Sequence, residues 1–386
     1  MPAQSRCRSP EFTFDEWASQ GYSAGQKTTK SSWITSGMRY RRTVAQRPMF
    51  CLPTIALQLA ASICVPTSTI ITEITMASIV NIGLRIPSVH PTDVEAVRRF
   101  ILEAENLGYH SIWVGDHVYY RVDVVDPLVL LTWAAAQTSR VRLGTAVMLT
   151  AYRNPVLLAK TASSIDYLSG GRLTLGISIG GTEAEYKSLG VAMNERVAHL
   201  RENVAVMRSL WAGEDVSYDG RYRQIEHGTM SPKPKQLSAD KTGVPLWFGG
   251  GSEPMLRRLA EIADGWVGSG GAPAENFVSG VESIKGFAKE KGRNPDTLGY
   301  SKLINVSVAD TKAKAYDLAK EHWSEYYGPN FDVDKSSIYG EPEAVRAGLR
   351  EFSEADTPEV TLILEPSSLD IAQLELLAKT TENLTG

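Results

Sequence analysis

Cysteine is scarce in this sequence, and charge of one sign is not concentrated enough to point to a polyanionic partner. The chain of 386 residues contains three cysteines (Cys7, Cys51 and Cys64), and all of them precede Met76. The sequence from Met76 onward therefore has no disulfide framework, no cysteine nucleophile and no cysteine metal ligand. The formal net charge is −4, so composition gives no sign of a nucleic-acid ligand or an anionic membrane surface.

Sequence motifs of several well-known catalytic sites are also missing. There is no HExxH zinc motif, and no glycine-rich loop is followed by GKS or GKT. Five histidines are scattered in positions more typical of surface or packing residues than of ligands, namely His90, His110, His199, His227 and His322. Glu183 and Glu185 are close in sequence, but nothing marks them as the paired acids of a glycosidase.

The composition changes at Met76. Residues 1–75 carry eight Lys or Arg and four acidic residues, so their net charge is +4 and that of the remaining chain is −8. The first 48 residues are rich in Ser, Thr, Arg and Gly without a sustained apolar period, a pattern that predicts disorder. From Met76 the sequence MASIVNIGLRIP enters a strand-like pattern at once. We therefore divide the chain into an extension, 1–75, and a folded domain, 76–386.

Residues 1–75 allow several interpretations. One is that the extension is not part of the mature protein and that Met76 is the true start. Another is a targeting segment, because 49–65 is apolar enough for a signal-peptide core and the Arg-rich, acid-poor composition suits an organellar transit peptide. The remaining interpretations are a membrane anchor and a tail of unknown use. For a membrane span, however, the stretch is short, and it contains Pro53 and Gln58. The expected location is the cytoplasm, or an organelle or the cell exterior if the extension is a genuine targeting segment.

From Met76 the chain alternates between strand and helix patterns. The predicted strands are near-continuous apolar runs, as in parallel sheets covered on both faces: 79–86, 111–116, 141–149, 172–180, 244–249, 265–269, 299–308 and 359–365. The predicted helices have apolar residues at three- and four-residue spacing: 93–107, 127–138, 156–168, 196–211, 253–263, 274–291, 312–326, 342–354 and 369–381. In the first helix Thr92 is the expected N-cap, and Gly108 is the expected stop.

Eight strand–helix units in this length predict an α/β fold, the (β/α)8 TIM barrel, with an insertion between strands four and five. The insertion contains a hairpin, 214–225, and a long loop, 231–243. An open doubly wound sheet is the alternative fold, but it requires a glycine-rich turn after the first strand, and GLRIPSVHPTD has none. Because sites in these barrels form at the carboxyl ends of the strands, the residues that follow each strand are the functional candidates.

The second predicted strand ends in an acid and an imidazole, in the stretch SIWVGDH at 111–117. Asp116 and His117 either open a solvated loop or bring two titratable groups into a site at the barrel mouth. His117 is a candidate general acid/base, because an imidazole with a pKa near 6.5 exchanges protons near neutral pH. Asp116 would then fix the tautomer of His117 or support its charged form.

Other strand ends carry further candidates. The loop 153–155 also begins a helix, and the paired glycines within 177–181 would let the backbone approach a flat ligand closely. The segment FGGGSEP at 248–254 opens a helix, so it is either a plain flexible turn or a set of backbone N–H groups for one cofactor phosphate. Lys302 lies inside a predicted strand and would suit a Schiff-base aldolase.

These segments resemble the bacterial luciferase-like superfamily, which comprises flavin-dependent monooxygenases and oxidoreductases that use the deazaflavin coenzyme F420. The resemblance covers 79–380 and rests on SIWVGDH, on the long block from 141 to 181 and on PLWFGGGSEPMLRRLAEIADGW. It implies a TIM barrel and a flavin- or deazaflavin-dependent oxidoreductase of monooxygenase type, which carries out hydride transfer or monooxygenation of a small organic substrate. The cofactor that it implies is F420 or FMN, with no metal.

The resemblance also implies roles for individual residues. His117 matches the catalytic histidine after strand two, and Asp116 matches the acid beside it in the deazaflavin branch. Ala146–Val147 matches a non-prolyl cis peptide under the isoalloxazine ring, and Gly180 lines the flavin face of strand four. The residues implied to hold the cofactor are Ala146, Val147, Gly180, Gly249, Gly250, Gly251 and Ser252.

The two cofactors are not separated by the resemblance alone. Luciferase has a phosphate-binding arginine near the end of strand four, where this chain has Ile179. This departure weakens a luciferase-like grip on FMN. Together with Asp116–His117 and the loop 153–155, it favours F420 slightly.

The expected partners are a small-molecule substrate, a second copy of the chain in a homo-oligomer and a separate flavin or deazaflavin reductase, with no nucleic acid. The loops 118–126, 214–243 and 327–340 would line the entrance. Tyr119 and Tyr120 in the first of them favour an apolar, aromatic substrate. The alternative function is a non-catalytic flavin-binding barrel, against which the presence of the Asp-His pair argues.

Overall fold

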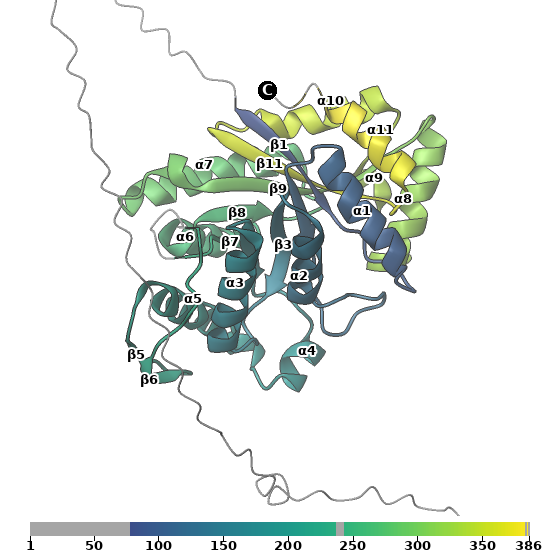
Figure 1. The fold of residues 1–386 in the computed structure, drawn as a ribbon. Helices are drawn as coiled ribbons and strands as arrows, with labels where there is room; N and C mark the ends of the chain where they lie inside the picture. Colours follow the sequence, from purple (N-terminus) through teal and green to yellow (C-terminus); the bar gives the residue numbers. More distant parts are fainter. Residues whose placement is uncertain (1–77, 237–242, 383, 385–386) are drawn as a thin grey trace, which may run out of the picture. The chain divides into compact units, whose positions relative to one another are not determined.

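The computed structural model describes residues 78–236, 243–382 and 384. Within them, eight parallel strands close into a barrel, because β8 pairs with β9 and completes the order β9–β11–β1–β2–β3–β4–β7–β8. The strands are β1 (Ile79–Arg85), β2 (Ser111–Val114), β3 (Arg142–Leu149), β4 (Leu173–Ser178), β7 (Leu246–Gly249), β8 (Gly265–Gly268), β9 (Gly299–Val308) and β11 (Glu359–Pro366). The predicted (β/α)8 TIM barrel is confirmed (Figure 1). The extension predicted at 1–75 lies outside the described residues.

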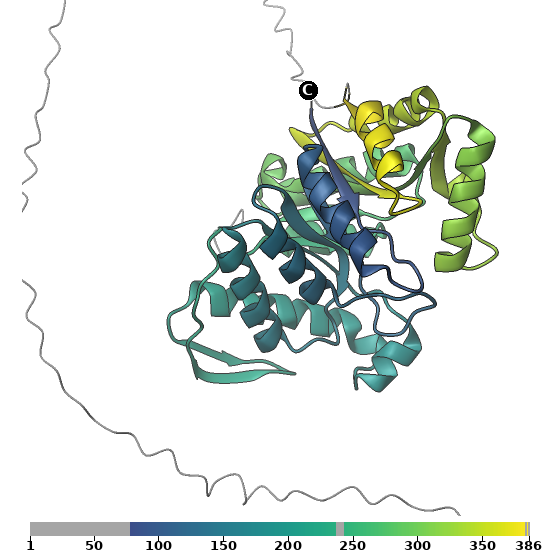
Figure 2. The same ribbon diagram turned by 45° about the vertical axis from the view of Figure 1, so that its right-hand side comes forward.

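Each predicted helix is present close to its expected ends. They are α1 (Val94–Asn106), α2 (Pro127–Gln137), α3 (Pro155–Ser169), α5 (Arg196–Ala212), α6 (Glu253–Ile262), α7 (Ala274–Glu290), α8 (Lys312–Tyr327), α10 (Pro342–Ser353) and α11 (Ile371–Thr381). At α1 the N-cap is Asp93 rather than Thr92, since the Asp93 carboxylate accepts a hydrogen bond of 2.9 Å from Ala96 N. The last helix, α11, packs beside α1 (Figure 2). Among the described helices, none is both long and apolar enough to cross a membrane.

The insertion between the fourth and fifth barrel strands is also present. Its predicted hairpin consists of β5 (Val216–Asp219) and β6 (Gln224–Gly228), which pair antiparallel. Part of the predicted loop 231–243 lies outside the described residues. Short elements that the sequence did not predict are α4 (Glu183–Ser188), η2 (Met193–Glu195), η3 (Pro295–Thr297), α9 (Val333–Ser336) and β10 (Ser337–Gly340). Of these, β10 extends the sheet outside the barrel by pairing in parallel with β9.

Two tryptophans fill part of the barrel interior. The ring centroids of Trp113 and Trp247 are 5.8 Å apart. Glycines make room for them, since a Cβ at Gly144 of β3 would lie 2.3 Å from the Trp113 ring and one at Gly299 of β9 would lie 2.2 Å from the Trp247 ring. Truncating a buried aromatic side chain of this kind to Ala typically costs about 3–5 kcal/mol. The two tryptophans thus belong to the packed barrel interior, where they lie with Ala146, Val267 and Ile363.

Candidate active site

Asp116 connects the ends of two neighbouring barrel strands. It is 4% exposed, and its carboxylate accepts hydrogen bonds from Leu149 N at 2.9 Å and from Arg153 Nη2 at 2.8 and 2.9 Å. Arg153 also reaches the exposed Asp126 at 3.0 Å. Burial raises the pKa of Asp116, although the positive charge of Arg153 opposes that shift. These hydrogen bonds go to the end of β3 and its loop, and not to His117 as the sequence suggested.

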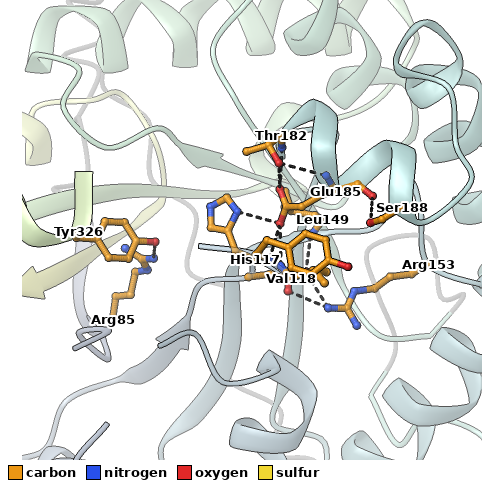
Figure 3. A network of polar contacts seen from close by, with 11 residues as sticks. Arg85, His117, Val118, Leu149, Arg153, Thr182, Glu185, Ser188 and Tyr326 are labelled. Carbon is orange, nitrogen blue, oxygen red and sulfur yellow. Dashed lines mark hydrogen bonds and ion pairs between the residues drawn. The ribbon is translucent and has the colours of Figure 1, made fainter. Parts of the chain in front are cut away.

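His117 follows Asp116 in sequence but contacts different residues. Its Nδ1 atom lies 3.3 Å from Oε1 of Glu185. Its ring stacks on that of Tyr120, with centroids 4.1 Å apart and planes 12° apart. The His117 side chain is 21% exposed, so the imidazole is held on two sides and still accessible. In Figure 3 it lies between Arg85 on one side and Arg153 on the other.

Glu185 is a candidate that no motif in the sequence had singled out. The side chain is fully buried. Its Oε2 atom accepts hydrogen bonds from the backbone N–H of Thr182 at 2.7 Å and from the Thr182 hydroxyl at 3.1 Å. Glu185 N donates to the Thr182 hydroxyl oxygen at 3.3 Å, which completes a capping box at the amino end of α4. Its Oε1 atom accepts from Val118 N at 2.7 Å and from Tyr119 N at 3.4 Å. The available signal was the T-x-x-E spacing of 182–185 directly after a barrel strand.

The charge state of Glu185 follows from these contacts. Burial acts to raise the pKa of Glu185, but the backbone N–H groups of Thr182 and Val118, together with His117, outweigh burial, and the pKa is lowered. The carboxylate is therefore ionised at neutral pH, and His117 faces a full negative charge.

The peptide bond between Ala146 and Val147 is cis, at the position where the resemblance placed such a bond. It lies where the register of β3 against β4 shifts, between Thr145 and Met148. Val147 packs against the end of β7, because a Cβ at Gly249 would lie 2.8 Å from Val147 Cγ1. Two segments that were expected to hold the cofactor are thus in contact, and the Val147 side chain occupies the space that a Cβ at Gly249 would need.

The loop between β7 and α6 presents an open helix terminus. Gly250 has a φ of +121°, a conformation that favours glycine, while a side chain at Gly251 would extend into open space. Ser252 is the N-cap residue of α6, and its hydroxyl makes no hydrogen bond to the first turn of that helix. The helix dipole at such a terminus favours negative charge, while Pro254 has no N–H and the N–H groups of Met255 and Leu256 already donate to Ser252 O. Gly180, at the end of β4, is also exposed.

A second polar cluster lies on the other side of His117, and sequence reasoning missed it. Arg85 at the end of β1 forms a buried ion pair with Glu365 of β11, and its Nη2 atom donates a hydrogen bond of 2.9 Å to the hydroxyl of Tyr326 in α8. The Tyr326 ring centroid is 4.8 Å from that of Tyr120, with the ring planes tilted by 51°, so Tyr120 lies between Tyr326 and His117 in a row of three rings. Arg85 and Tyr326 are 241 residues apart in sequence, so no local pattern could show the cluster.

Lys302 does not join this site. Its Nζ atom donates hydrogen bonds to the backbone oxygens of Ser269 at 2.5 Å and Leu303 at 2.7 Å, and it lies over the ring of Phe352 in α10. Burial lowers the pKa of Lys302 to about 7. Because the amine packs against α10 outside the barrel, the geometry does not favour the aldolase alternative. Within the described residues, no group of three or more His, Cys, Asp or Glu side chains is placed to hold a metal ion.

The closed parallel sheet with helices between its strands places the protein in the class of (β/α)8 barrels. The chain matches the model of the luciferase-like monooxygenase family over residues 76–363. It belongs to that family. The resemblance inferred from the sequence is confirmed by this match.

The proteins that this chain is similar to include an F420-dependent enzyme and an enzyme solved with FMN. An F420-dependent glucose-6-phosphate dehydrogenase of Kineococcus radiotolerans is 34% identical over 227 residues, which cover 56% of this chain and 65% of the dehydrogenase. The monooxygenase RslO1 of Streptomyces bottropensis has a TM-score of 0.69 at 22% identity, covering 79% of this chain and 100% of its own. The oxygenating part of a diketocamphane monooxygenase of Pseudomonas putida, solved with FMN, has a TM-score of 0.64 at 20% identity, covering 80% and 98%. The two structures support the fold, and the partial coverage of the dehydrogenase leaves its substrate as a property of that protein.

Proposed function

We propose that the protein is an oxidoreductase that binds F420 or FMN at the barrel mouth, with F420 favoured, and acts on a small organic substrate. The observation that carries this proposal is His117, an accessible imidazole paired with the ionised carboxylate of Glu185 in a luciferase-like barrel. An imidazole so placed suits proton transfer near neutral pH. Asp116 serves the same site indirectly by fixing the ends of β2 and β3.

The residues at the mouth fit such a cofactor. Val147 packs against Gly249 where the resemblance places the flat ring, and the terminus at Gly251 and Ser252, where a side chain would meet open space, suits a phosphate. When bound, F420 would supply hydride transfer, whereas reduced FMN would supply activation of oxygen. Ile179 stands where luciferase has an arginine, and this difference supports the preference for F420.

The side chains around His117 then have distinct tasks. His117 would take a proton from the substrate or return one to it, while Tyr120 stacks on the imidazole and holds the ring plane. Tyr326 and Arg85 form the wall beyond Tyr120. Tyr119, which is 55% exposed, offers an aromatic surface at the entrance. Such a wall favours a substrate with an apolar or aromatic part.

The proposal is tested by binding and consumption measurements in parallel. Oxidised F420 and FMN are titrated into the protein, and cofactor fluorescence is recorded. We expect saturable binding of one cofactor, tighter for F420, and oxidation or reduction of the bound cofactor with members of a substrate panel. Tight binding without any turnover across the panel would favour the alternative function, a non-catalytic flavin-binding barrel. Binding of neither cofactor would refute the proposal.

We also propose that the chain forms a homo-oligomer through α2 and α3. The α2 sequence PLVLLTWAAAQ carries no charge and is apolar on all sides, a pattern typical of a buried helix. Yet Val129 of α2 is 63% exposed, and Leu157 and Leu168 of α3 are 68% and 76% exposed. A second copy of the chain would cover these exposed apolar side chains. Light scattering on the wild type and on Val129→Glu tests the proposed oligomer, with a smaller assembly expected for the variant.

If the enzyme uses reduced FMN, a separate reductase would supply the reduced FMN.

A further inference from the structure

The Glu185 carboxylate holds two segments of the mouth at once. One oxygen, Oε2, is engaged by Thr182 at the amino end of α4, and the other, Oε1, is engaged by the backbone of the loop after β2 and by His117 (Figure 3). The carboxylate is fully buried, so its position is set by protein contacts. Any shift of Glu185 would move α4 and the loop that carries His117 together.

We propose that Glu185 is a positioning residue that selects the tautomer of His117. An ionised carboxylate can only accept hydrogen bonds, so the ring atom that faces it has to carry a hydrogen. That atom is Nδ1, 3.3 Å from Oε1. Neutral His117 therefore carries its proton on Nδ1, which leaves Nε2 unprotonated and able to accept a proton from a substrate. The catalytic meaning of this step rests on the proposed function, whereas the tautomer itself does not.

The same contacts oppose a flip of the imidazole. A rotation that exchanged the positions of Nδ1 and the ring carbon would leave Oε1 without its ring donor, and the stack on Tyr120, 12° from parallel, restricts tilting of the ring. Oε1 also binds Val118 N at 2.7 Å, so the backbone next to the imidazole is tied to the same acceptor. The direction of the Nε2 lone pair is thus fixed by one carboxylate and one aromatic face.

Asp116, the acid adjacent to His117 in sequence, does not have this role. Both of its oxygens face Arg153, and one also accepts from Leu149 N. The two carboxylates next to the imidazole therefore differ in function: Asp116 joins the strands, and Glu185 orients the imidazole. A carboxylate that orients a histidine typically changes activity by about 10–100-fold in metal sites, and we expect an effect of that size on turnover in Glu185→Gln.

The test measures the tautomer directly in the cofactor-free full-length protein. Histidine-selective 15N labelling and long-range proton–nitrogen NMR at pH 8 report which ring nitrogen carries the proton, and His117→Gln assigns the signals of His117. We expect Nδ1 protonated and Nε2 unprotonated in the wild type. In Glu185→Ala we expect the tautomer with its proton on Nε2, which an unconstrained neutral histidine prefers. In Glu185→Gln we expect a mixture of the Nδ1 and Nε2 tautomers.

The matched control is Glu183→Gln, which removes the same charge from an exposed position of the same helix. The control should keep the wild-type tautomer, as should Asp116→Asn. A wild-type His117 protonated on Nε2, or a Glu185→Ala variant that keeps Nδ1 protonated with the fold intact, would overturn the proposal. If Glu185→Ala does not fold, the wild-type spectrum and the Glu185→Gln spectrum still decide. Because no cofactor is present, an inactive protein with the expected tautomer would contradict only the proposed function.

Discussion

The Asp116 carboxylate and the Arg153 guanidinium form a close ion pair in which Nη2 lies 2.8 Å from one carboxylate oxygen and 2.9 Å from the other. The Asp116 side chain is 1% exposed and that of Arg153 is 21% exposed. Arg153 makes a second ion pair, with Asp126, whose side chain is 42% exposed. One guanidinium thus joins a buried acid to a surface acid. The two ion pairs should therefore contribute different amounts to the free energy of unfolding.

Asp116→Asn keeps the shape of the side chain but removes the charge that pairs with Arg153. Hydrogen bonds to charged groups contribute about 1.5–3 kcal/mol, but the burial that raises the pKa of Asp116 offsets part of this, so the free energy of unfolding in urea should fall by an amount at the lower end of that range. Asp126→Asn is the matched control, since it removes the exposed pair while Asn still caps α2 as well as Asp does. Exposed pairs contribute at most about 1 kcal/mol. Equal losses in the two variants would show that Asp116 does not stabilise the mouth more than the surface pair does.

Residues 76–386 should fold without the extension. The composition break at Met76 and the strand that begins at Ile79 motivate this expectation. A chain that starts at Met76 should be soluble, give the circular dichroism of an α/β protein and unfold cooperatively. An insoluble or unfolded product would mean that 1–75 contributes to the folded domain.

Much of the fold was accessible from sequence, because the eight apolar strands and the amphipathic helices have strong local patterns. The N-cap of α1 was placed one residue early, since Thr92 and Asp93 are both good capping residues and only the structure shows which carboxylate or hydroxyl reaches Ala96 N. Short elements such as α4 and β10 escaped because four to six residues carry too little periodicity to stand out.

The candidate site was less predictable, because its contacts join distant segments. His117 and Glu185 are 68 residues apart, and Asp116 was predicted to support His117 because the two are adjacent in the chain and because the resemblance matches Asp116 to the acid beside the catalytic histidine. Neighbours at the end of a strand point in different directions, so adjacency made Asp116 the wrong partner. The cis bond at Ala146–Val147 came from resemblance alone, since no residue pattern predicts it.

A side chain at Gly251 should weaken cofactor binding. Gly250 has a φ of +121°, so a substitution there would strain the backbone as well, whereas Gly251 faces open space. Gly251→Val should reduce cofactor affinity at least tenfold, about 1.4 kcal/mol, with unchanged thermal stability. Gly286→Val, on the exposed face of α7 and also with open space around it, is the control. If fluorescence titration gives both variants wild-type affinity, the loop does not bind the phosphate.

His110 should make the stability of the protein depend on pH in a defined window. Burial, with a further contribution from Arg142, lowers the pKa of His110 to about 4, whereas a histidine in the unfolded chain titrates near 6.5. Between these values the unfolded chain binds a proton that the folded protein does not. The free energy of unfolding therefore falls as pH decreases from about 6.5 to about 4, by about 3 kcal/mol for the full shift.

The measurement compares the wild type with His110→Gln in urea at several pH values. The difference between their unfolding free energies isolates the contribution of His110, because other titrating groups act in both proteins. That difference should change by roughly the full shift across the window and be flat above pH 7. A difference that stays constant from pH 7 to pH 4 would show that His110 is protonated in the folded state as readily as in the unfolded one.

His117 should be required for turnover but not for cofactor binding. If the imidazole transfers a proton, His117→Ala should lose about 10²–10⁴-fold in rate and still bind the cofactor, because the expected binding segments lie on β3, β4 and β7. His117→Gln keeps a hydrogen-bonding side chain next to Glu185 but cannot titrate, so it should be nearly as slow. His227→Gln, which changes a histidine that is 83% exposed, should retain the wild-type rate. Single-turnover oxidation or reduction of the tighter-binding cofactor, followed by stopped-flow absorbance, measures all three. A His117→Gln rate within about threefold of wild type, far less than the effect of a general acid/base, would mean that the β2 strand ends in Asp-His only to open a solvated loop.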